Sequence, residues 1–327
     1  MPFSFHNINT GLTLPCVAAV VLCNILILLM IRAGVLDHPV ERSSHTRPTP
    51  KGGGIGIVGA FVLCLIPALR AAHAPASIIP AITGLLIGMI VLGAVSWLDD
   101  MRPFPARYKL AAQFLAAIAA AFGAIYGTHT PLWTLVPFVL ATVFITNALN
   151  FIDGINGLAS GVMAISALFL AGAGIMPAAF MLLAICLLGF LPYNFPKARI
   201  FMGDVGSQPI GLAIAWGGMT GFRAGGGVLV IALLSGVLWD VTFTLLRRAR
   251  DGDRLAQAHR GHLYQLAIRS GLPVPLVTLL YWGFALWGAA AFATGQIIIT
   301  IVMIALPQIL WTGYICTRAR TRVQDRW

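Results

Sequence analysis

Four aspartates in this chain could support cation-dependent chemistry, because each occurs where a long apolar stretch ends. They are Asp99 and Asp100 in the sequence WLDD, Asp153 and Asp204. The chain has only ten acidic residues among 327. A carboxylate at the centre of a membrane helix costs roughly 2.5 to 3.5 kcal/mol on insertion scales. A chain this apolar keeps such groups mainly where they hold a cation or react, so we expect the function to lie at these residues.

The sequence NALNFIDGINGLA at 147–159 adds amide side chains to this set. Asn147, Asn150 and Asp153 follow one another at intervals of three residues, which would place them near one face of a helix. Amide and carboxylate oxygens are hard ligands that suit Mg²⁺ rather than Zn²⁺. The alternative is a polar helix end with a glycine cap.

Asp204 lies between two glycines in FMGDVGSQPIG at 201–211. A carboxylate beside free backbone N–H groups at a helix N-terminus suits a pair of metal and phosphate. Simple helix capping by Asp204 or Ser207 is the alternative. The adjacent carboxylates of Asp99 and Asp100 repel each other unless a cation intervenes. They indicate either a magnesium or phosphate-proton site, or a solvated helix end.

Three basic segments could bind the phosphate groups of a substrate. Lys51 and the glycines of SHTRPTPKGGG at 44–54 could surround phosphate, or the segment could simply lead flexibly into a span. Lys109 is either a phosphate ligand or a lysine that extends to the membrane surface. HRGHLYQ at 259–265 is either a phosphate- or sugar-binding loop or a basic surface loop. Asp240 could line the same cavity or pair with Arg247 or Arg248.

The elements that carry these residues are membrane spans. Apolar residues make up 59% of the chain and charged residues 9%, whereas a soluble domain is about a quarter charged. We expect one all-α polytopic membrane domain over 1–327. A span needs about 20 apolar residues, and we predict eleven, with ten as the alternative count: 12–31, 53–72, 78–98, 108–126, 132–149, 157–174, 176–192, 207–222, 227–246, 274–294 and 297–316.

The distribution of basic residues predicts the orientation of these spans. With the N-terminus outside and the C-terminus in the cytoplasm, only Arg70 and Arg223 of the 21 Lys and Arg fall outside, as the positive-inside rule requires. Because the basic residues lie in loops between spans, the net charge of +11 does not indicate nucleic-acid binding. All ten acids then fall on the cytoplasmic side. We expect the catalytic face to be formed by cytoplasmic segments 32–53, 99–109, 147–157, 193–207 and 247–273.

Taken together, the motifs resemble the polyprenyl-phosphate N-acetylhexosamine-1-phosphate transferase family, glycosyltransferase family 4. The matching elements are SHTRPTPKGGG, WLDD, NxxNFxDGxNGLA, FMGDxGS and HRxHLYQ, in the family's order from about 37 to 265. The form of HRGHLYQ is most similar to the branch that starts O-antigen synthesis. The set is specific, although no single motif would be.

The resemblance implies a role for each residue. Asp99, Asp100 and Asp153 would be catalytic, with the first two forming the family's acidic pair. Asp204 and Asn150 would face Mg²⁺, for which Mn²⁺ could substitute. The substrate-binding residues would be Lys51, Lys109, Asn147, His259, Arg260 and His262. Position 156 is Asn where many bacterial members have Asp, so no acid–base role is assigned there.

The implied reaction is the Mg²⁺-dependent transfer of N-acetylhexosamine 1-phosphate from a UDP-sugar to undecaprenyl phosphate, which releases UMP. It would start a lipid-linked glycan, in lipopolysaccharide or cell-wall synthesis, on the cytoplasmic side of the bacterial inner membrane. The expected partners are the two substrates and the lipid bilayer; the sequence leaves the oligomeric state open, with a homodimer as one alternative. The competing hypothesis is a polytopic transporter with an acidic site on its cytoplasmic side.

Overall fold

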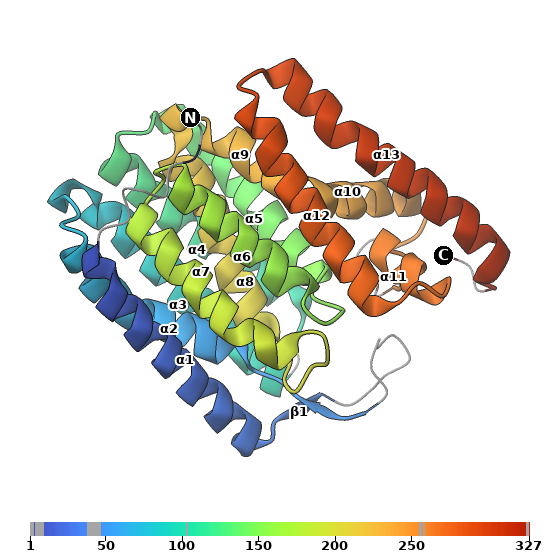
Figure 1. The fold of residues 1–327 in the computed structure, drawn as a ribbon, viewed down its shortest axis with the longest axis horizontal. Coiled ribbons are helices and arrows are strands. Elements are labelled where there is room, and N and C mark those ends of the chain that lie inside the picture. Colours follow the sequence, from blue (N-terminus) through green and yellow to red (C-terminus); the bar gives the residue numbers. More distant parts are fainter. Residues whose placement is uncertain are drawn as a thin grey trace.

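The computed structural model describes residues 3, 10–37, 47–102, 104–254, 257, 259–324 and 327, and these form a helical bundle (Figure 1). Residues 38–46 of the predicted segment 32–53 lie outside the described residues. The α-helices in the described part are α1 Thr13–Ala33, α2 Gly54–Ala71, α3 Ile79–Met101, α4 Ala106–Thr128, α5 Leu135–Phe151, α6 Leu158–Gly172, α7 Pro177–Asn194, α8 Asp204–Thr220, α9 Gly226–Leu233, α10 Ser235–Arg250, α11 Leu263–Arg269, α12 Val274–Ala293 and α13 Ile297–Arg322.

One very small sheet accompanies the helices. Strand β1, Leu36–Asp37, pairs antiparallel with β2, Thr49–Pro50, and Leu36 lies opposite Pro50. Four short 3₁₀ turns, Thr10–Leu12, Ala76–Ile78, Leu132–Thr134 and Phe222–Ala224, precede or join helices. Apart from this hairpin the described residues confirm the predicted all-α class.

Each of the eleven predicted spans contains a helix, but they do not form eleven uniform spans. Within the described residues, eight helices are long and apolar enough to cross a membrane, and the pair α9–α10 would make a ninth. The predicted span 227–246 is wrong as a single helix, because α9 and α10 meet at Leu234 with a bend of 71°. Helices α6 and α8 have only 15 and 17 residues.

The short helix α8 lies at the centre of the bundle. Every residue from Val205 to Met219 is buried, and α8 packs against α2, α3, α4, α5, α6 and α9. A helix surrounded by other helices does not have to match the bilayer thickness, which explains its length. The large aromatic Trp216 is 1% exposed. The helix that begins at Asp204 is therefore held on all sides.

The two ends of the chain lie at opposite ends of the bundle (Figure 1). Phe3 packs against Phe169 and Phe292, where α6 and α12 end. At the end of α10, the guanidinium carbon of Arg247 lies 4.8 Å from the centre of the Trp327 ring. Which end faces the cytoplasm stays a prediction from the basic residues.

A close approach between α2 and α8 requires glycine on both helices. A Cβ built on Gly54 would overlap the Cα of Gly206. The N–H of Gly54 also donates to the carbonyl of Met202 at 2.9 Å. Because the two backbones are nearly in contact, the start of α8 is fixed against the start of α2.

We expect Gly54→Ala to destabilise the protein, because the added methyl group would force α2 away from Gly206. Overpacking of this kind costs about 1 to 3 kcal/mol of unfolding free energy. Thermal unfolding in detergent measures it. Gly283→Ala is the matched control, since its helical position is exposed and open around the added atom. That variant should be neutral or gain up to about 1 kcal/mol, and equal melting temperatures for the two variants would contradict the prediction.

Candidate active site

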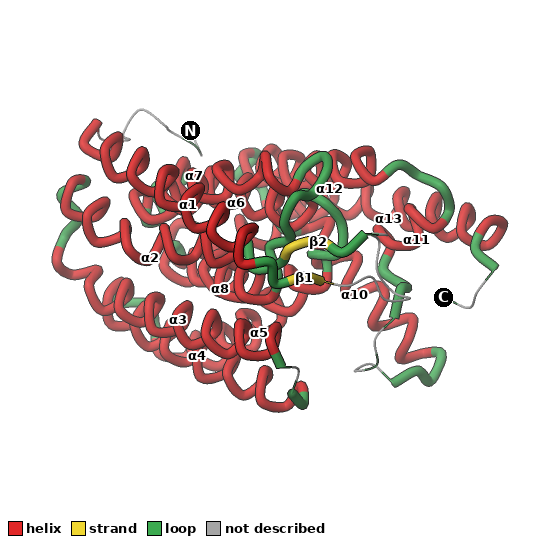
Figure 2. The backbone as a smooth tube through the Cα atoms, turned by 90° about the horizontal axis from the view of Figure 1, so that it is seen from below, coloured by secondary structure: helices red, strands yellow, loops and turns green. Residues whose placement is uncertain are grey.

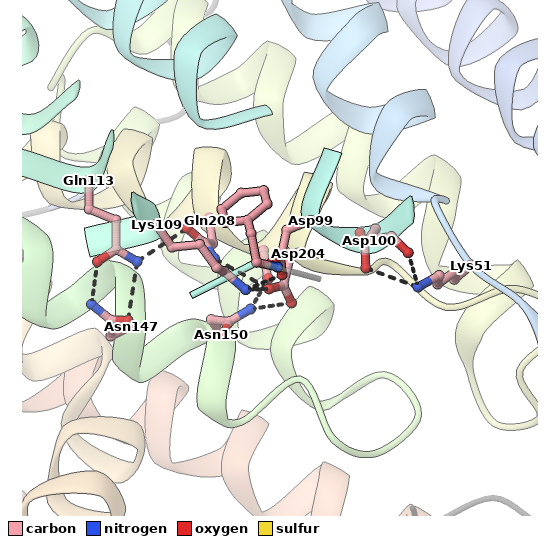
Figure 3. A network of polar contacts seen from close by, with 11 residues as sticks. Lys51, Asp99, Asp100, Lys109, Gln113, Asn147, Asn150, Asp204 and Gln208 are labelled. Atoms are coloured by element: carbon pink, nitrogen blue, oxygen red, sulfur yellow. Dashed lines mark hydrogen bonds and ion pairs between the residues drawn. The ribbon is translucent and has the colours of Figure 1, made fainter. Parts of the chain in front are cut away.

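The functional residues meet because helix ends of alternating direction gather at one end of the bundle. Helices α3 and α5 end there, and α4 and α8 begin there. Asp99 and Asp100 therefore come from the end of α3, Lys109 from the start of α4, and Asp204 from the start of α8 (Figure 3). Residues far apart in the sequence thus form one polar cluster.

Lys109 bridges two of the four aspartates. Its Nζ donates to Asp99 Oδ2 at 2.7 Å and to Asp204 Oδ2 at 2.5 Å. All three side chains are largely buried, with 23%, 15% and 29% of each exposed. Charge-assisted hydrogen bonds in such a setting are stronger than those at a surface. One ammonium therefore holds the end of α3 to the start of α8.

Lys51 provides a second positive charge on the other side of Asp100. Its Nζ donates to the backbone oxygen of Asp100 at 2.7 Å and lies 3.3 Å from Oδ1. The other carboxylate oxygen, Oδ2, is buried and makes no well-formed hydrogen bond among the described residues, and the backbone N–H of Val205 is the donor that lies near this carboxylate. A buried carboxylate oxygen without a well-formed hydrogen bond is costly, so Asp100 has an oxygen available for a cation.

The strand before α2 brings Lys51 to this place. The N–H of Phe201 donates to the carbonyl of Pro50, and the N–H of Gly53 donates to the carbonyl of Phe201. The N–H groups of Gly53 and Gly54 are thus engaged by backbone carbonyls and are not available to phosphate here. The physical reason for these glycines is close packing, and among the described residues 47–54 it is the side chain of Lys51 that bonds to the cluster.

A chain of amide side chains supports Asp204. Asn150 Nδ2 donates to Asp204 Oδ1 at 2.8 Å and to Ser207 Oγ at 2.8 Å. Gln208 Nε2 lies 3.4 Å from Asp204 Oδ2. Neither Asp204 nor Ser207 caps α8, because Gly203, with a φ of 74°, occupies that position. The alternative of simple helix capping is therefore wrong.

Two buried glutamines extend this chain, and the sequence interpretation missed both. Gln113 and Asn147 form a reciprocal pair of hydrogen bonds at 3.1 and 2.7 Å, and Gln113 also donates to Gln208 Oε1 at 3.2 Å (Figure 3). A signal was present, since Gln113 follows Lys109 by four residues and Gln208 follows Asp204 by four. Residues at that spacing share one helix face.

Asp153 joins the cluster from a turn rather than from a helix. Helix α5 ends at Phe151, so the expected helical face of Asn147, Asn150 and Asp153 stops before the aspartate. Asp153 nevertheless lines the same cavity. Burial raises the pKa of this carboxyl well above its ordinary value, and the carboxylates of Asp204 and Asp100 raise it further. A cation beside these residues would oppose that shift.

The segment 259–265 forms the opposite wall. His259 and His262 line the cavity with Tyr264 and Gln265, and the two histidine rings are 4.8 Å apart. Tyr264 donates its hydroxyl to the carbonyl of Phe151 at 3.0 Å, which ties the segment to the end of α5. Arg260 does not line the cavity. Its predicted contact with substrate stays a prediction.

Asp240 has a different role from either one expected. It does not line the cavity, and it is fully buried within α10. Its carboxylate accepts the N–H groups of Leu263 and Tyr264. The expected partners are engaged elsewhere, because Arg247 donates to the carbonyl of Gly261 and Arg248 pairs with Asp253 at 3.7 Å. Asp240 therefore supports the histidine segment from behind.

These side chains surround one cavity of about 1130 Å³. All four aspartates line it, together with Lys51, Lys109, Asn147, Asn150, His259 and His262. The structure thus brings together ten of the eleven predicted site residues, and Arg260 is the exception. The cavity walls are both polar and apolar, since Phe151, Ile155, Phe201 and Leu245 also contribute.

The oxygen donors of the cluster fit magnesium better than a metal that needs a complete protein cage. No group of three or more His, Cys, Asp or Glu is arranged to hold a metal within the described residues. Mg²⁺ usually takes one or two carboxylates and completes its shell with water and substrate phosphate. Asp100 Oδ2 makes no well-formed hydrogen bond in the described part of the chain. Asn150 presents its nitrogen to Asp204, so its amide would have to turn by half a rotation to bind a cation.

Comparison with known proteins gives a consistent group of relatives. The model of the family described as Glycosyl transferase family 4 matches residues 82–222. Decaprenyl-phosphate N-acetylglucosaminephosphotransferase of Mycobacterium tuberculosis is 32% identical over 81% of this chain and 77% of the relative. A probable undecaprenyl-phosphate N-acetylglucosaminyl 1-phosphate transferase of Bacillus subtilis is 28% identical over 74% and 72%. Phospho-N-acetylmuramoyl-pentapeptide-transferase of Moorella thermoacetica is 31% identical over 78% and 86%.

Burial of His259 predicts how the stability of the protein depends on pH. Burial lowers the pKa of His259 to about 4, with the nearby His262, Arg248 and Arg247 adding to the effect. In the unfolded chain the same group titrates near 6.5. Between these values the unfolded state binds a proton that the folded state does not, so the free energy of unfolding decreases as the pH falls from about 6.5 to 4.

We therefore expect His259→Gln to lose less stability than the unmodified protein over this pH range. Above pH 7 the two proteins should differ by a constant amount, because neither form of His259 is then protonated. Thermal unfolding in detergent at several pH values measures the difference. Parallel curves from pH 8 to 4 would show that His259 is not buried in a positive environment.

Proposed function

This chain belongs to glycosyl transferase family 4, and we propose that it transfers N-acetylhexosamine 1-phosphate from a UDP-sugar to a polyprenyl phosphate, with release of UMP. N-acetylglucosamine is the first candidate for the sugar, because two of the compared relatives are named for it. Undecaprenyl phosphate is the first candidate for the acceptor. The product would start a lipid-linked glycan of the bacterial envelope.

The observation that carries this proposal is the Lys109 bridge between Asp99 and Asp204 at the edge of a large cavity. Both substrates bring clustered negative charge, so their reaction requires positive charge in a site shielded from water. The cavity is lined by two ammonium groups, the guanidinium of Arg107 and five carboxylates, since Asp37 joins the four aspartates already described. In such a site a metal ion can replace a lysine as the partner of the carboxylates, and the lysine can then bind a phosphate. An ion pair with a purely structural role would not need to line a cavity.

The place of each residue around the cavity suggests its role. Asp204, Asp100 and Asn150 would hold Mg²⁺, which supplies charge neutralisation for a diphosphate when it is bound. Lys51 and Lys109 would bind phosphate oxygens once they are released from their carboxylates. His259 and His262 would contact the diphosphate or sugar from the opposite wall. Asn147 and Gln113 keep the supporting amides in place.

The transfer itself needs an oriented nucleophile more than a strong base. An oxygen of the acceptor phosphate attacks the phosphorus next to the sugar, and the bond between that phosphorus and the oxygen of UMP breaks. A phosphate monoester is largely dianionic at neutral pH, so Asp99 would mainly orient it and remove any residual proton. In the rival two-step scheme an aspartate attacks first and carries the sugar phosphate.

Placement of the acids favours an enzyme over a transporter. A transporter with membrane acids should have them along a path across the bilayer. Here the cavity acids come from helix ends at one end of the bundle, and the basic residues indicate that this end faces the cytoplasm. A nucleotide sugar would reach the cavity from that side.

The direct test is a screen of donors with the purified protein. We expect UMP release only when undecaprenyl phosphate, Mg²⁺ and a UDP-N-acetylhexosamine are all present, with no release from UDP-glucose. Omission of each component in turn is the control. A protein that binds these ligands and releases no UMP with any donor would contradict the proposal. Labelled sugar phosphate retained on the protein without acceptor would favour the two-step scheme.

A substitution at Asp204 tests the metal-binding assignment. We expect Asp204→Asn to fold normally but to lower kcat at least about 100-fold, because a charged oxygen ligand becomes neutral. Steady-state kinetics over a range of Mg²⁺ concentrations measures this. Asp251→Asn is the matched control, since Asp251 is exposed and outside the cavity, and its activity should be unchanged. Full activity of Asp204→Asn at saturating Mg²⁺ would rule out the ligand role.

A further inference from the structure

Asp240 is a buried carboxylate with an unusual number of donors, and they come from three helices. It is 0% exposed. Its Oδ2 accepts the hydroxyl of Tyr281 on α12 at 2.5 Å and the N–H of Tyr264 at 3.0 Å. Its Oδ1 accepts the N–H of Leu263 at 2.8 Å and the hydroxyl of Thr244, one turn further along α10, at 3.3 Å. A buried carboxylate with this many donors stays ionised and holds its partners rigidly.

The fifth partner of Asp240 is a side chain of the cavity wall. His262 Nδ1 lies 3.2 Å from Asp240 Oδ1, and His262 is 4% exposed. An ionised carboxylate can only accept hydrogen bonds, so His262 donates to Asp240 in the tautomer that carries its proton on Nδ1, the tautomer that this inference takes. Since His262 also lines the cavity, its other nitrogen, Nε2, is the one left for a ligand.

We propose that Asp240 is a positioning residue for the transfer reaction, which fixes His262 so that Nε2 faces the sugar diphosphate of the donor. The proposal rests on the proposed function. Asp240 itself touches no substrate, because it does not line the cavity. It acts through His262, as a carboxylate behind a metal-bound or catalytic histidine does.

The bend between α9 and α10 places Asp240 behind the histidine segment. Because the two helices meet at 71°, α10 leaves the direction of α9 and extends away from the bundle (Figure 2). Helices α10, α11 and α12 then lie side by side (Figure 1). A straight helix over 227–246 would carry Asp240 along the bundle instead. The bend is therefore what brings Asp240 next to α11.

A purely structural role predicts a different outcome from the positioning role. If Asp240 only capped α11, its loss would loosen the whole wall and weaken the binding of both substrates. The wall is also held at Tyr264, which bonds to the carbonyl of Phe151, and at His262, whose N–H donates to Gln265 Oε1 at 3.2 Å. Loss of the carboxylate charge should therefore act mainly on His262 and on the donor.

The test compares Asp240→Asn, His262→Gln and the double variant in UMP-release kinetics, with each substrate varied in turn. We expect either single change to raise the KM for the UDP-sugar about tenfold, which is within the range seen for residues that orient a functional histidine. The KM for undecaprenyl phosphate should change less than about twofold. The double variant should be no worse than His262→Gln, since both changes remove one interaction. Multiplied effects, or equal rises in both KM values, would overturn the proposal.

Tyr281→Phe provides a milder test that does not depend on the folding of Asp240→Asn. It removes one donor to Asp240 and leaves the bonds to His262 and Leu263 intact. We expect a rise of about two- to threefold in the donor KM, within the effect of one net hydrogen bond. That rise should disappear when the same change is made in His262→Gln. An equal rise in both backgrounds would overturn the proposal.

Hydrogen exchange separates failure of this inference from failure of the proposed function. In Asp240→Asn the amides of Leu263 and Tyr264, which donate to this carboxylate, should exchange about tenfold faster, while those of α5 and α8 should keep their rates. If the unmodified protein releases no UMP with any donor, the proposed function fails, and this measurement still decides whether Asp240 holds the segment. Unchanged exchange at Leu263 and Tyr264 would overturn the positioning role.

Discussion

The structure depends on one constraint, which is that carboxylates at the edge of a membrane bundle must be neutralised where water is scarce. Lys109 meets this requirement for Asp99 and Asp204 together, and Lys51 meets it for Asp100. Each lysine thereby joins segments that are distant in the sequence. The ends of α3 and α8 and the strand before α2 are held at fixed positions because their charges need one another.

The central position of α8 follows from the same requirement. A helix that starts with an aspartate of the cluster cannot shift without breaking the ion pair. The bundle surrounds α8 on many sides, and the glycines at 54 and 206 let α2 approach its first turn. Packing therefore gives the end of the cavity that is proposed to bind Mg²⁺ a rigid base. The amides of Gln113, Asn147 and Gln208 then satisfy polar groups that would otherwise be buried without partners.

The opposite wall is built on a separate carboxylate. Among the described residues no lysine pairs with Asp240, and its carboxylate instead contacts hydroxyl, imidazole and backbone donors. It holds a segment that would otherwise be a surface loop. The cavity thus has two walls of different character, one based on ion pairs that can exchange and one based on hydrogen bonds that cannot. This difference suits a site in which a cation and phosphates enter on one side and a sugar is oriented on the other.

The amino-acid sequence by itself determined the all-α class and the positions of most helices, and ten of the eleven site residues that it predicted line the cavity. It could do so because apolar periodicity marks helices and because acids in an apolar chain are too costly to be incidental. Only the tertiary structure decided that α9 and α10 are bent apart, that Gln113 and Gln208 belong to the cluster, and that Asp240 supports His262. Helix bends and hydrogen-bond partners depend on which neighbours pack against a residue, and a single chain's local pattern does not contain that information.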